Sequence, residues 1–289
     1  MRRSKAIKAK ERVTLVLAVN ATGTHKIPVA LIGRAKQPLC FRTAGCVSPL
    51  PYFHQRNSWM DGEVFKKWLE TVFLAAVRAR TIEKVALIVE NLASHEAVED
   101  EQLLFITLPP NTTAVFQPLD AGVIECLKRR HKRRFLEGLI RSHNSSVRTP
   151  AVSAAGARAR SSLLSNGRVN LLDVARIIRE EWACITAESI VRCWLKADCL
   201  PASSAAPLRA QHADYHNATT PPVAAIVDEI TTLLRGTTLG SRLFPGTAVS
   251  GLPQGVLGWL CGETDPHVVE DTVDLALSQD NEEYREEEE

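Results

Sequence analysis

Two carboxylates in the first half of the chain are spaced so that they could share a metal ion. Glu90 ends the apolar run 84–90, and Asp120 follows a second apolar run, 103–108, and a loop. Apolar runs of four to eight residues between turn signals indicate strands buried on both faces. Open α/β sheets bind their ligands at the carboxyl ends of the strands. We therefore expect Glu90 and Asp120 to converge at the rim of one sheet and face one pocket.

Carboxylates in that position could hold Mg²⁺ or Mn²⁺. Phosphodiester chemistry with two metals needs acids that bridge ions about 3.5 to 4 Å apart. Three interpretations stay open for Glu90 and Asp120: an intact two-metal site, a weak remnant of one, or two cleft acids that hold no metal. Asn91 and His95 follow Glu90 and could support the acids, although a lone histidine beside a short helix is more often a surface or cap residue.

A basic run directly after Asp120 is the second candidate for function. It could neutralise phosphates of a nucleic acid in a sequence-independent, salt-sensitive way, or serve as a nuclear localisation patch. It could equally be an ordinary solvated helix face. Its six members are Lys128, Arg129, Arg130, Lys132, Arg133 and Arg134.

Several elements must position these side chains. Segments 12–20 and 27–33 predict a hairpin around Gly23, with Pro28 placing the second strand near a sheet edge. Asp61 is a suitable N-cap for an amphipathic helix. Residues 91–102 are long enough for the short crossover helix that parallel pairing of the next two strands requires. A further helix is expected from Asp120 to about Arg141.

The remainder divides into smaller parts. We expect an α/β domain over 10–141, with irregular structure over 34–60 inside it, then a Ser/Ala/Arg-rich linker over 142–166 and a helical module over 167–200. Residues 201–289 are expected to hold a linker to residue 222, a short helix over 224–234 and an acidic, disordered tail.

Charge and composition limit the classes of protein to which this chain could belong. The net charge of +2 conceals eleven acids and one base after residue 264, so the rest of the chain carries about +12, which is compatible with nucleic acid. No run of eighteen apolar residues indicates a membrane span. The start of the chain does not resemble a secretory signal. Seven cysteines without a Cys-x-x-Cys pair argue against a disulfide framework or a zinc site.

The motifs together resemble the DDE endonuclease domain of pogo/Tigger-type transposases, of the Tc1/mariner superfamily, over about residues 10–200. The resemblance rests on segments 10–14 and 20–23, the helix start at 59–61, Asn91 and His95, the loop 108–124, and, past the linker, Trp182, the segment 190–194 and Lys196-Ala197.

This resemblance implies an RNase H-like fold in which three carboxylates hold two divalent metals. Glu90 matches the second acid and Asp120 the third, with twenty-nine residues between them. The family has Asp where this chain has Glu90. Its first acid lies on a central strand before the hairpin, which this sequence starts too late to contain, and its N-terminal DNA-binding domains are likewise not included. Without that strand we expect either unpaired edges or direct pairing of the hairpin with strand 84–90, and a marginal or rearranged core.

The fold expected is therefore α/β, an RNase H-like mixed sheet lacking its first strand. The function expected is a nuclear, transposase-derived protein that binds DNA and whose cleavage activity is lost or much weakened. Two alternatives remain: an active metal-dependent endonuclease, and a truncated relic or incomplete gene model with no activity of its own. The sequence gives no DNA target and no oligomeric state.

Overall fold

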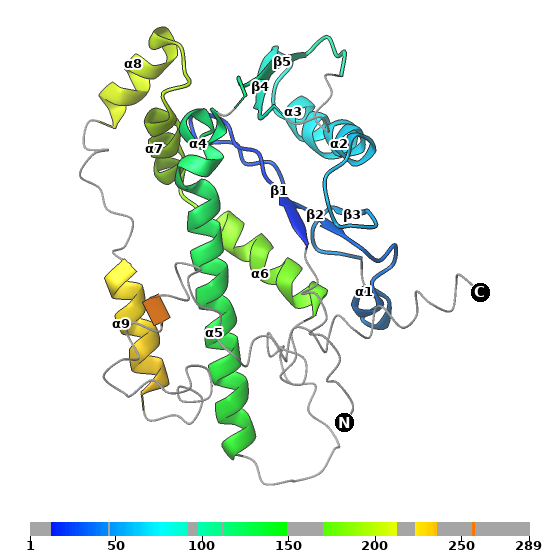
Figure 1. Cartoon of the computed structure of the whole chain (residues 1–289), viewed down its shortest axis with the longest axis vertical. Coiled ribbons are helices and arrows are strands. Elements are labelled where there is room, and N and C mark those ends of the chain that lie inside the picture. The colour runs from blue at the N-terminus through cyan, green and yellow to red at the C-terminus, as the bar shows by residue number, and fades with distance from the viewer. Residues whose placement is uncertain are drawn as a thin grey trace, which may run out of the picture.

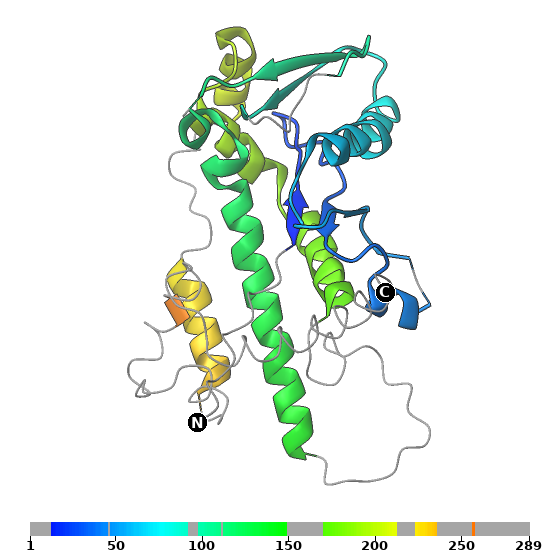
Figure 2. The same ribbon diagram turned by 45° about the vertical axis from the view of Figure 1, so that its right-hand side comes forward.

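The strands form two small sheets. The computed structural model describes residues 13–45, 47–91, 98–110, 112–148, 170–212, 223–235 and 256–257. One sheet has the order β1 (Thr14–Val16), β2 (Ala30–Gly33) and β3 (Tyr52–His54), with β2 antiparallel to β1 and parallel to β3. The other pairs β4 (Val85–Val89) in parallel with β5 (Leu103–Thr107). Figures 1 and 2 show the β4–β5 pair at the top of the molecule, above the three-stranded sheet.

β2 is the centre of a three-layer arrangement. Its neighbouring side chains point to opposite faces, as in any strand. Ala30 and Ile32 belong to one buried cluster, formed with the helical segment 62–78, and both are fully buried. Leu31 and the preceding Val29 belong to the other cluster, formed with helices from the second half of the chain. A strand buried on both faces must be apolar throughout, which explains the sequence of β2.

The first helical layer consists of α2 (Gly62–Trp68), a π-helical turn η1 (Leu69–Phe73) and α3 (Leu74–Arg78). The predicted start is confirmed: a side-chain oxygen of Asp61 accepts a hydrogen bond from the backbone N–H of Val64 at 2.9 Å. The buried face of this helical segment, 62–78, packs on both sheets through Phe65, Trp68 and Phe73. This helix therefore joins the two sheets into one core.

The predicted hairpin is confirmed, with Thr14 opposite Ile32 and an isolated bridge between Val19 and Lys26. Gly23 has φ +66°, and a Cβ atom there would lie 2.4 Å from the carbonyl oxygen of Ala187. The second strand, expected at or near a sheet edge, is not itself an edge strand, because β3 pairs with the other side of β2, but it lies next to the edge strand β1. Pro28 lies before β2 begins, so it breaks no pairing in the sheet.

The stretch 34–60, which we expected to be irregular, contains both α1 (Leu39–Thr43) and β3. These elements are short, and the apolar pattern of so few residues is too weak to identify them. β3 extends the sheet beyond β2, and Phe53 contributes to the cluster under α2.

After β5 the chain forms α4 (Thr113–Phe116), a π-helical turn η2 (Leu119–Val123) and the long helix α5 (Ile124–Arg148). Gly122 interrupts η2 with φ +151°, where a Cβ atom would lie 3.1 Å from Cys193 Sγ. The predicted helix from Asp120 is thus confirmed, but it continues past Arg141 to Arg148. The linker expected from residue 142 does not begin there, and residues 149–169 lie outside the described ones.

The predicted helical pair is present as α6 (Leu171–Ala183) and α7 (Ala187–Ala197), and the short helix as α9 (Val223–Leu234). The linker expected over 201–222 is wrong for its first half, because α8 (Ala202–Gln211) forms there. Pro207 lies inside α8 and hid it from sequence analysis, since proline usually ends a helix. The acidic tail lies outside the described residues.

In both views α6 and α9 flank α5 on opposite sides (Figures 1 and 2). Leu171, Ala175, Ile178 and Trp182 of α6 share one buried cluster with Leu127 of α5 and Leu31 of β2. α6 therefore covers the second face of the sheet instead of standing apart from it.

An α/β architecture is confirmed. Among the described residues β1 and β4 are not paired with each other, so of the two arrangements expected without the first strand the structure has the one with unpaired edges, and the strands form two sheets. Most of the expected crossover between β4 and β5 lies in residues 92–97, outside the described ones, and 98–102 are not helical. None of the helices in the described ranges is long and apolar enough to cross a membrane.

Candidate functional site

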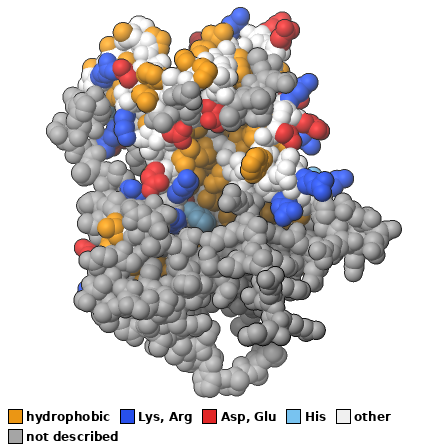
Figure 3. Space-filling view, in the orientation of Figure 1, with side chains coloured by type: hydrophobic (Ala, Val, Ile, Leu, Met, Phe, Trp, Pro, Cys, Tyr) orange, Lys and Arg blue, Asp and Glu red, His pale blue; other side chains and the backbone are white. Residues whose placement is uncertain are grey.

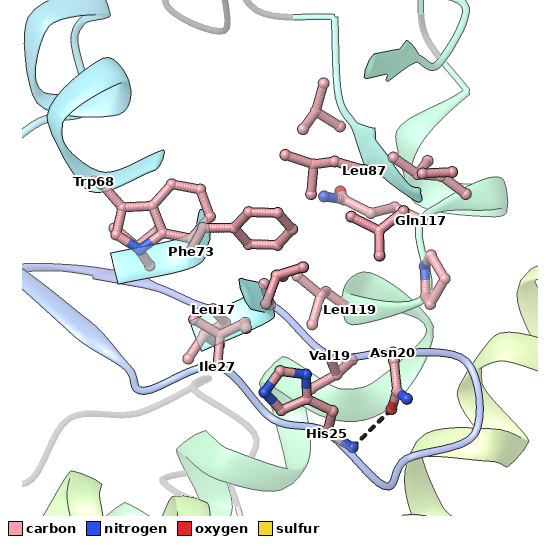
Figure 4. A pocket seen from close by; sticks show the side chains of 18 of the residues that line it. Leu17, Val19, Asn20, His25, Ile27, Trp68, Phe73, Leu87, Gln117 and Leu119 are labelled. Carbon is pink, nitrogen blue, oxygen red and sulfur yellow. Dashed lines mark hydrogen bonds between the residues drawn. The ribbon is translucent and has the colours of Figure 1, made fainter. Parts of the chain in front are cut away.

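A cavity of about 680 Å³ lies between the two sheets. One wall is the first strand of the hairpin, another is β4, and the floor comes from the helix 62–78. Figure 4 shows Trp68 and Phe73 across the cavity from Leu87 and Gln117, with the hairpin residues Leu17 and Val19 below them. The cavity is mainly apolar, and its polar side chains come from the ends of the strands.

Glu90 is one of those polar side chains. It follows the last residue of β4, is half-buried and lines the cavity. The strand places it there because parallel pairing with β5 brings the carboxyl ends of both strands to one edge. Glu90 thus borders a cavity at the rim of a sheet, while the expectation that Asp120 faces the same pocket stays a prediction, since Asp120 is not among the residues that line it.

Asp120 lies next to the same cavity without lining it. Gln117, Pro118 and Leu119, directly before it, line the cavity, and Asp120 itself lies in the first turn of η2 with an exposed side chain. Neighbouring atoms still remove part of its hydration, and this desolvation raises the pKa of Asp120, while the charge of Lys128 acts in the opposite direction. A cation would relieve that cost by favouring the ionised carboxylate.

A possible site for a divalent metal was sought among the described residues. No group of three His, Cys, Asp or Glu side chains lies close enough together there to hold an ion. Mg²⁺ is commonly held by one or two carboxylates together with water and substrate phosphates. Glu90 and Asp120 are two carboxylates of the kind that such a site uses. Asn91 is described and exposed, whereas His95 lies outside the described residues.

Most of the predicted basic run is engaged in ion pairs within the fold. Arg129 pairs with Glu125 at 2.7 Å, and Arg133 pairs with Glu137 at 3.1 Å. Other pairs cross between helices and bind α5 to α6 and α9. They are Arg130–Glu181 at 2.9 Å, Arg133–Glu229 at 2.6 Å, and Arg134 with Glu180 at 3.2 Å and Glu181 at 3.5 Å.

These ion pairs show that the arginines of the basic run are bound to glutamates within the fold. Glu181 and Glu137 are only 11% and 14% exposed, so their partners are held more firmly than in a surface ion pair. Hydrogen bonding to Glu180 also raises the pKa of Arg134. Lys128, in contrast, is exposed near Asp120, and the exposed Lys196 donates a hydrogen bond to the carbonyl of Ala121 at 3.2 Å. Both amines are thus close to η2.

Sequence analysis did not identify His25, Arg80 and Trp194, which also line the cavity. Burial lowers the pKa of His25, and the charge of Arg80 adds to that effect, so both favour the neutral imidazole. The backbone N–H of His25 donates to Asn20 Oδ1 at 2.9 Å, which fixes the hairpin loop at the cavity (Figure 4). The position of His25 near the end of a hairpin was the only signal in the sequence.

Comparison with known proteins gives the family of this site. The model of the family described as DDE superfamily endonuclease matches residues 10–194. Mouse Jerky protein is 32% identical over 124 residues, covering 39% of this chain and 22% of that protein. Mouse Tigger transposable element-derived protein 4 is 24% identical over 194 residues, covering 65% of this chain and 33% of that protein.

ARS-binding protein 1 of Schizosaccharomyces pombe is 29% identical over 153 residues, covering 49% of this chain and 28% of that protein. The chain thus spans between about a fifth and a third of the length of these relatives. No solved structure is significantly similar to it.

Proposed function

The chain belongs to the DDE superfamily endonuclease family, and from this we propose that it is a nuclear, transposase-derived protein that binds nucleic acid and has lost most or all of its strand-cleavage activity. The two sheets, on this proposal, are the two parts of one ancestral RNase H-like sheet. Relatives named for a transposable element and for ARS binding support the origin and the class of ligand. The same proposal includes the domain division: an α/β domain over 10–141, a linker over 142–166 and a helical module over 167–200.

The length of the acid at position 90 is the observation that supports the loss of cleavage. Glu90 and Asp120 match two acids of the family, which has Asp where this chain has Glu90. Two carboxylates with water and phosphate oxygens could hold a single Mg²⁺ or Mn²⁺ weakly. Glu is one methylene longer than Asp, and a displacement of a reacting group by about 1 Å can cost about a hundredfold in rate, so Glu90 would support little cleavage.

Binding of a phosphate backbone is supported by the amines near η2. Lys128 and Lys196 are exposed and close to the mouth of the cavity. Arg129, Arg130, Arg133 and Arg134 would contribute only after breaking their ion pairs with glutamates. We therefore assign the contact with phosphate mainly to the two lysines, and the arginines of the run to stability.

Salt dependence distinguishes these two assignments. The logarithm of the affinity for duplex DNA falls with the logarithm of salt with a slope of about −0.9 for each phosphate neutralised. Fluorescence anisotropy of a labelled duplex should give a slope of about −2 for the two lysines, against about −5 for the six-residue run. Lys128→Ala combined with Lys196→Ala should abolish most of the salt dependence, whereas Lys66→Ala, an exposed lysine on α2, should not. An affinity that does not change with salt would contradict the proposal.

Cleavage is tested separately, by nicking of supercoiled plasmid DNA with Mg²⁺ or Mn²⁺. We expect no nicking above the background given by Asp120→Asn. Nicking that Asp120→Asn and Glu90→Gln both abolish would establish the alternative, an active endonuclease that uses these two acids with a further ligand.

A further inference from the structure

The stretch 12–60, which contains the three-stranded sheet, is basic and has no acid at all. Its six cationic side chains supply half of the net charge of about +12 that residues 1–264 carry, and the first acid after them is Asp61, the N-cap of α2. The six are Arg12, Lys26, Arg34, Lys36, Arg42 and Arg56. A surface of one sign attracts oppositely charged ligands, so the positions of these cations in the fold are important.

Three of these cations lie at one end of the sheet. β2 and β3 are parallel, and Gly33 opposite His54 is their last pair, so both strands end at the same side. Arg34 directly follows β2, Lys36 comes two residues later, and Arg56 comes two residues after β3. All three side chains are exposed.

The loop after β3 crosses the end of β2. β1 lies on the opposite side of β2 from β3, and the hydroxyl of Thr14 in β1 donates to the carbonyl of Ser58 at 2.7 Å. The chain has therefore passed from β3 to β1 by residue 58. Over the end of β2, Arg34 Nε donates to the carbonyl of Arg56 at 3.2 Å. These two contacts bring Trp59, the next residue of the loop, to the same end of the sheet.

The charges at this end are available to a ligand. Arg34, Lys36 and Arg56 form no ion pair within the described ranges. The arginines of α5, by contrast, are bound to glutamates. Figure 3 shows a group of Lys and Arg side chains at the right-hand side of the molecule, where Figure 1 places β3. An anionic ligand could thus bind here without breaking a contact between charged side chains.

Trp59 adds an aromatic surface beside the cations. Its side chain is 64% exposed, although its backbone is held: Gln55 Oε1 accepts from the N–H of Trp59 at 3.3 Å and from the N–H of Asn57 at 2.6 Å. An indole ring has a large apolar face on which another planar group can stack. Cations with an adjacent exposed aromatic ring are the combination by which proteins bind single strands of nucleic acid.

We propose that this end of the sheet, formed by Arg34, Lys36, Arg56 and Trp59, is a binding site for single-stranded nucleic acid. The three cations contact phosphates of one strand, and the indole of Trp59 stacks on an unpaired base. The bases of a duplex stack on one another and are not available to the indole, so the aromatic side chain defines the class of ligand. The site uses none of the residues assigned to duplex binding above and does not depend on that assignment.

The test uses the full chain and a fluorescein-labelled oligothymidylate of about ten nucleotides. Anisotropy should show saturable binding. An abasic oligonucleotide of the same length keeps the phosphates and lacks the bases, and it should bind about tenfold more weakly. Equal binding of the two, or no binding of oligothymidylate, would refute the proposal.

An oligouridylate of the same length distinguishes RNA from DNA as the source of the strand, since the ribose 2′-OH is the group by which proteins tell them apart. Both strands should bind, because phosphates and base faces are common to them, and the tighter one identifies the source. Binding of oligouridylate that the abasic oligonucleotide matches would again refute stacking on a base.

Variants of Trp59 locate the base. Trp59→Ala should weaken binding of oligothymidylate about tenfold, whereas Trp59→Phe keeps an aromatic face and should retain binding within about threefold. Ile82, which is 97% exposed outside this end of the sheet, gives the control Ile82→Ala, which should have no effect. Equal affinities of the Trp59→Ala and Ile82→Ala variants would show that the indole is not part of the site.

The salt dependence counts the phosphate contacts. Three cations on a single strand predict a slope of about −2 in the logarithm of affinity against the logarithm of salt, and Lys36→Gln combined with Arg56→Gln should reduce it to about −0.7. Lys66→Gln combined with Lys67→Gln, two exposed lysines of α2, is the matched control and should leave the slope unchanged. The same slope in both double variants would contradict the assignment of these cations.

A last pair of measurements separates this site from the duplex site near η2. Lys128→Ala combined with Lys196→Ala should leave the affinity for oligothymidylate within about twofold of the unchanged protein. Trp59→Ala should likewise leave the affinity for duplex DNA unchanged. Loss of most oligothymidylate binding in the variant lacking the two lysines would place the single strand at η2 and would refute a second site.

Discussion

Lys26 and Trp182 join the hairpin to the end of α6. The Lys26 Nζ atom donates to the backbone carbonyl of Trp182 at 2.8 Å, while the indole Nε1 of Trp182 donates to the carbonyl of Ile27 at 3.0 Å. Lys26 also donates to the carbonyls of Ala183 and Ile185 at 2.9 and 2.7 Å. Trp182 and Ala183 are the last residues of α6 and Ile185 follows it, so the ammonium lies at the C-terminal end of this helix, where a positive charge is favourable. This reciprocal contact fixes the second helical layer on the sheet.

Replacing Lys26 with methionine should therefore lower the free energy of unfolding by about 2 kcal/mol, since three carbonyls lose a charged donor. The measurement is urea denaturation followed by tryptophan fluorescence. Lys36→Met is the matched control, because Lys36 is exposed and has no such contact in the described part of the chain. Similar losses for both variants would show that the contact at α6 does not contribute.

Gly23 and Gly45 form a second matched pair. Both have positive φ, +66° and +57°, but a Cβ atom at Gly23 would lie 2.4 Å from the backbone of Ala187, whereas no atom of the described part of the chain lies within 4 Å of a Cβ atom at Gly45. Gly45→Ala should cost only the conformational strain, about 1–2 kcal/mol. Gly23→Ala should cost about 1–3 kcal/mol more, because the hairpin must move away from α7. Equal midpoints in a denaturation series would mean that the hairpin and α7 are not in contact in solution.

His131 predicts a loss of stability in mild acid. Burial lowers its pKa from 6.5 to about 4, with a further contribution from the charge of Lys132, and its Nε2 atom has no hydrogen-bond partner in the described ranges. The unfolded chain takes up this proton near pH 6.5 and the folded chain only near pH 4. Stability is therefore full above pH 6.5 and falls as the pH drops between these values.

The variant His131→Phe keeps an aromatic ring beside Phe135 and removes the titration. The wild-type protein should lose up to about 3 kcal/mol more than this variant between pH 7 and pH 4. Chemical denaturation at several pH values measures the difference in stability between the two proteins. Because both proteins contain the same carboxylates, the contribution of these groups to the pH dependence cancels. Parallel curves would show that His131 is accessible to protons in the folded state.

Glu181 connects the stability of the helices with DNA binding. It is 11% exposed and pairs with Arg130 and Arg134 of α5. Glu181→Gln should lower the free energy of unfolding by about 1–3 kcal/mol, since Arg130 loses its carboxylate partner and Arg134 loses one of several. The same change should increase the affinity for duplex DNA and steepen its salt slope, because those cations become available to phosphates.

The control is Glu188→Gln, which removes an exposed partner of Arg192 on α7. It should change stability by no more than about 0.5 kcal/mol, with no change in the slope of DNA binding. A loss of DNA affinity on Glu181→Gln would mean that the arginines of α5 contact DNA in their paired arrangement.

Local elements were predictable where a short stretch of sequence determines them. The N-cap at Asp61, the hairpin around Gly23 and the strand before Glu90 all depend on neighbouring residues. The helix α8 was not predicted, because Pro207 argues against a helix that tertiary packing of Ala205 and Leu208 supports. The position of Glu90 beside a cavity was predictable, whereas that of His25, which lines the same cavity, was not.

The sequence by itself determined the family, the order of the elements and the residue types that could bind a metal, since motifs and periodicity are properties of neighbouring residues. Only the tertiary structure decided which charges are available and which edges are paired. The sequence of the basic run is the same whether its side chains are solvated or ion-paired. They are ion-paired here because glutamates 46 to 96 residues away in the chain lie beside them. The cavity likewise lies between two sheets whose strands are far apart in sequence. Pairing of charges and of backbone edges is decided by distance in space, which a linear pattern does not contain.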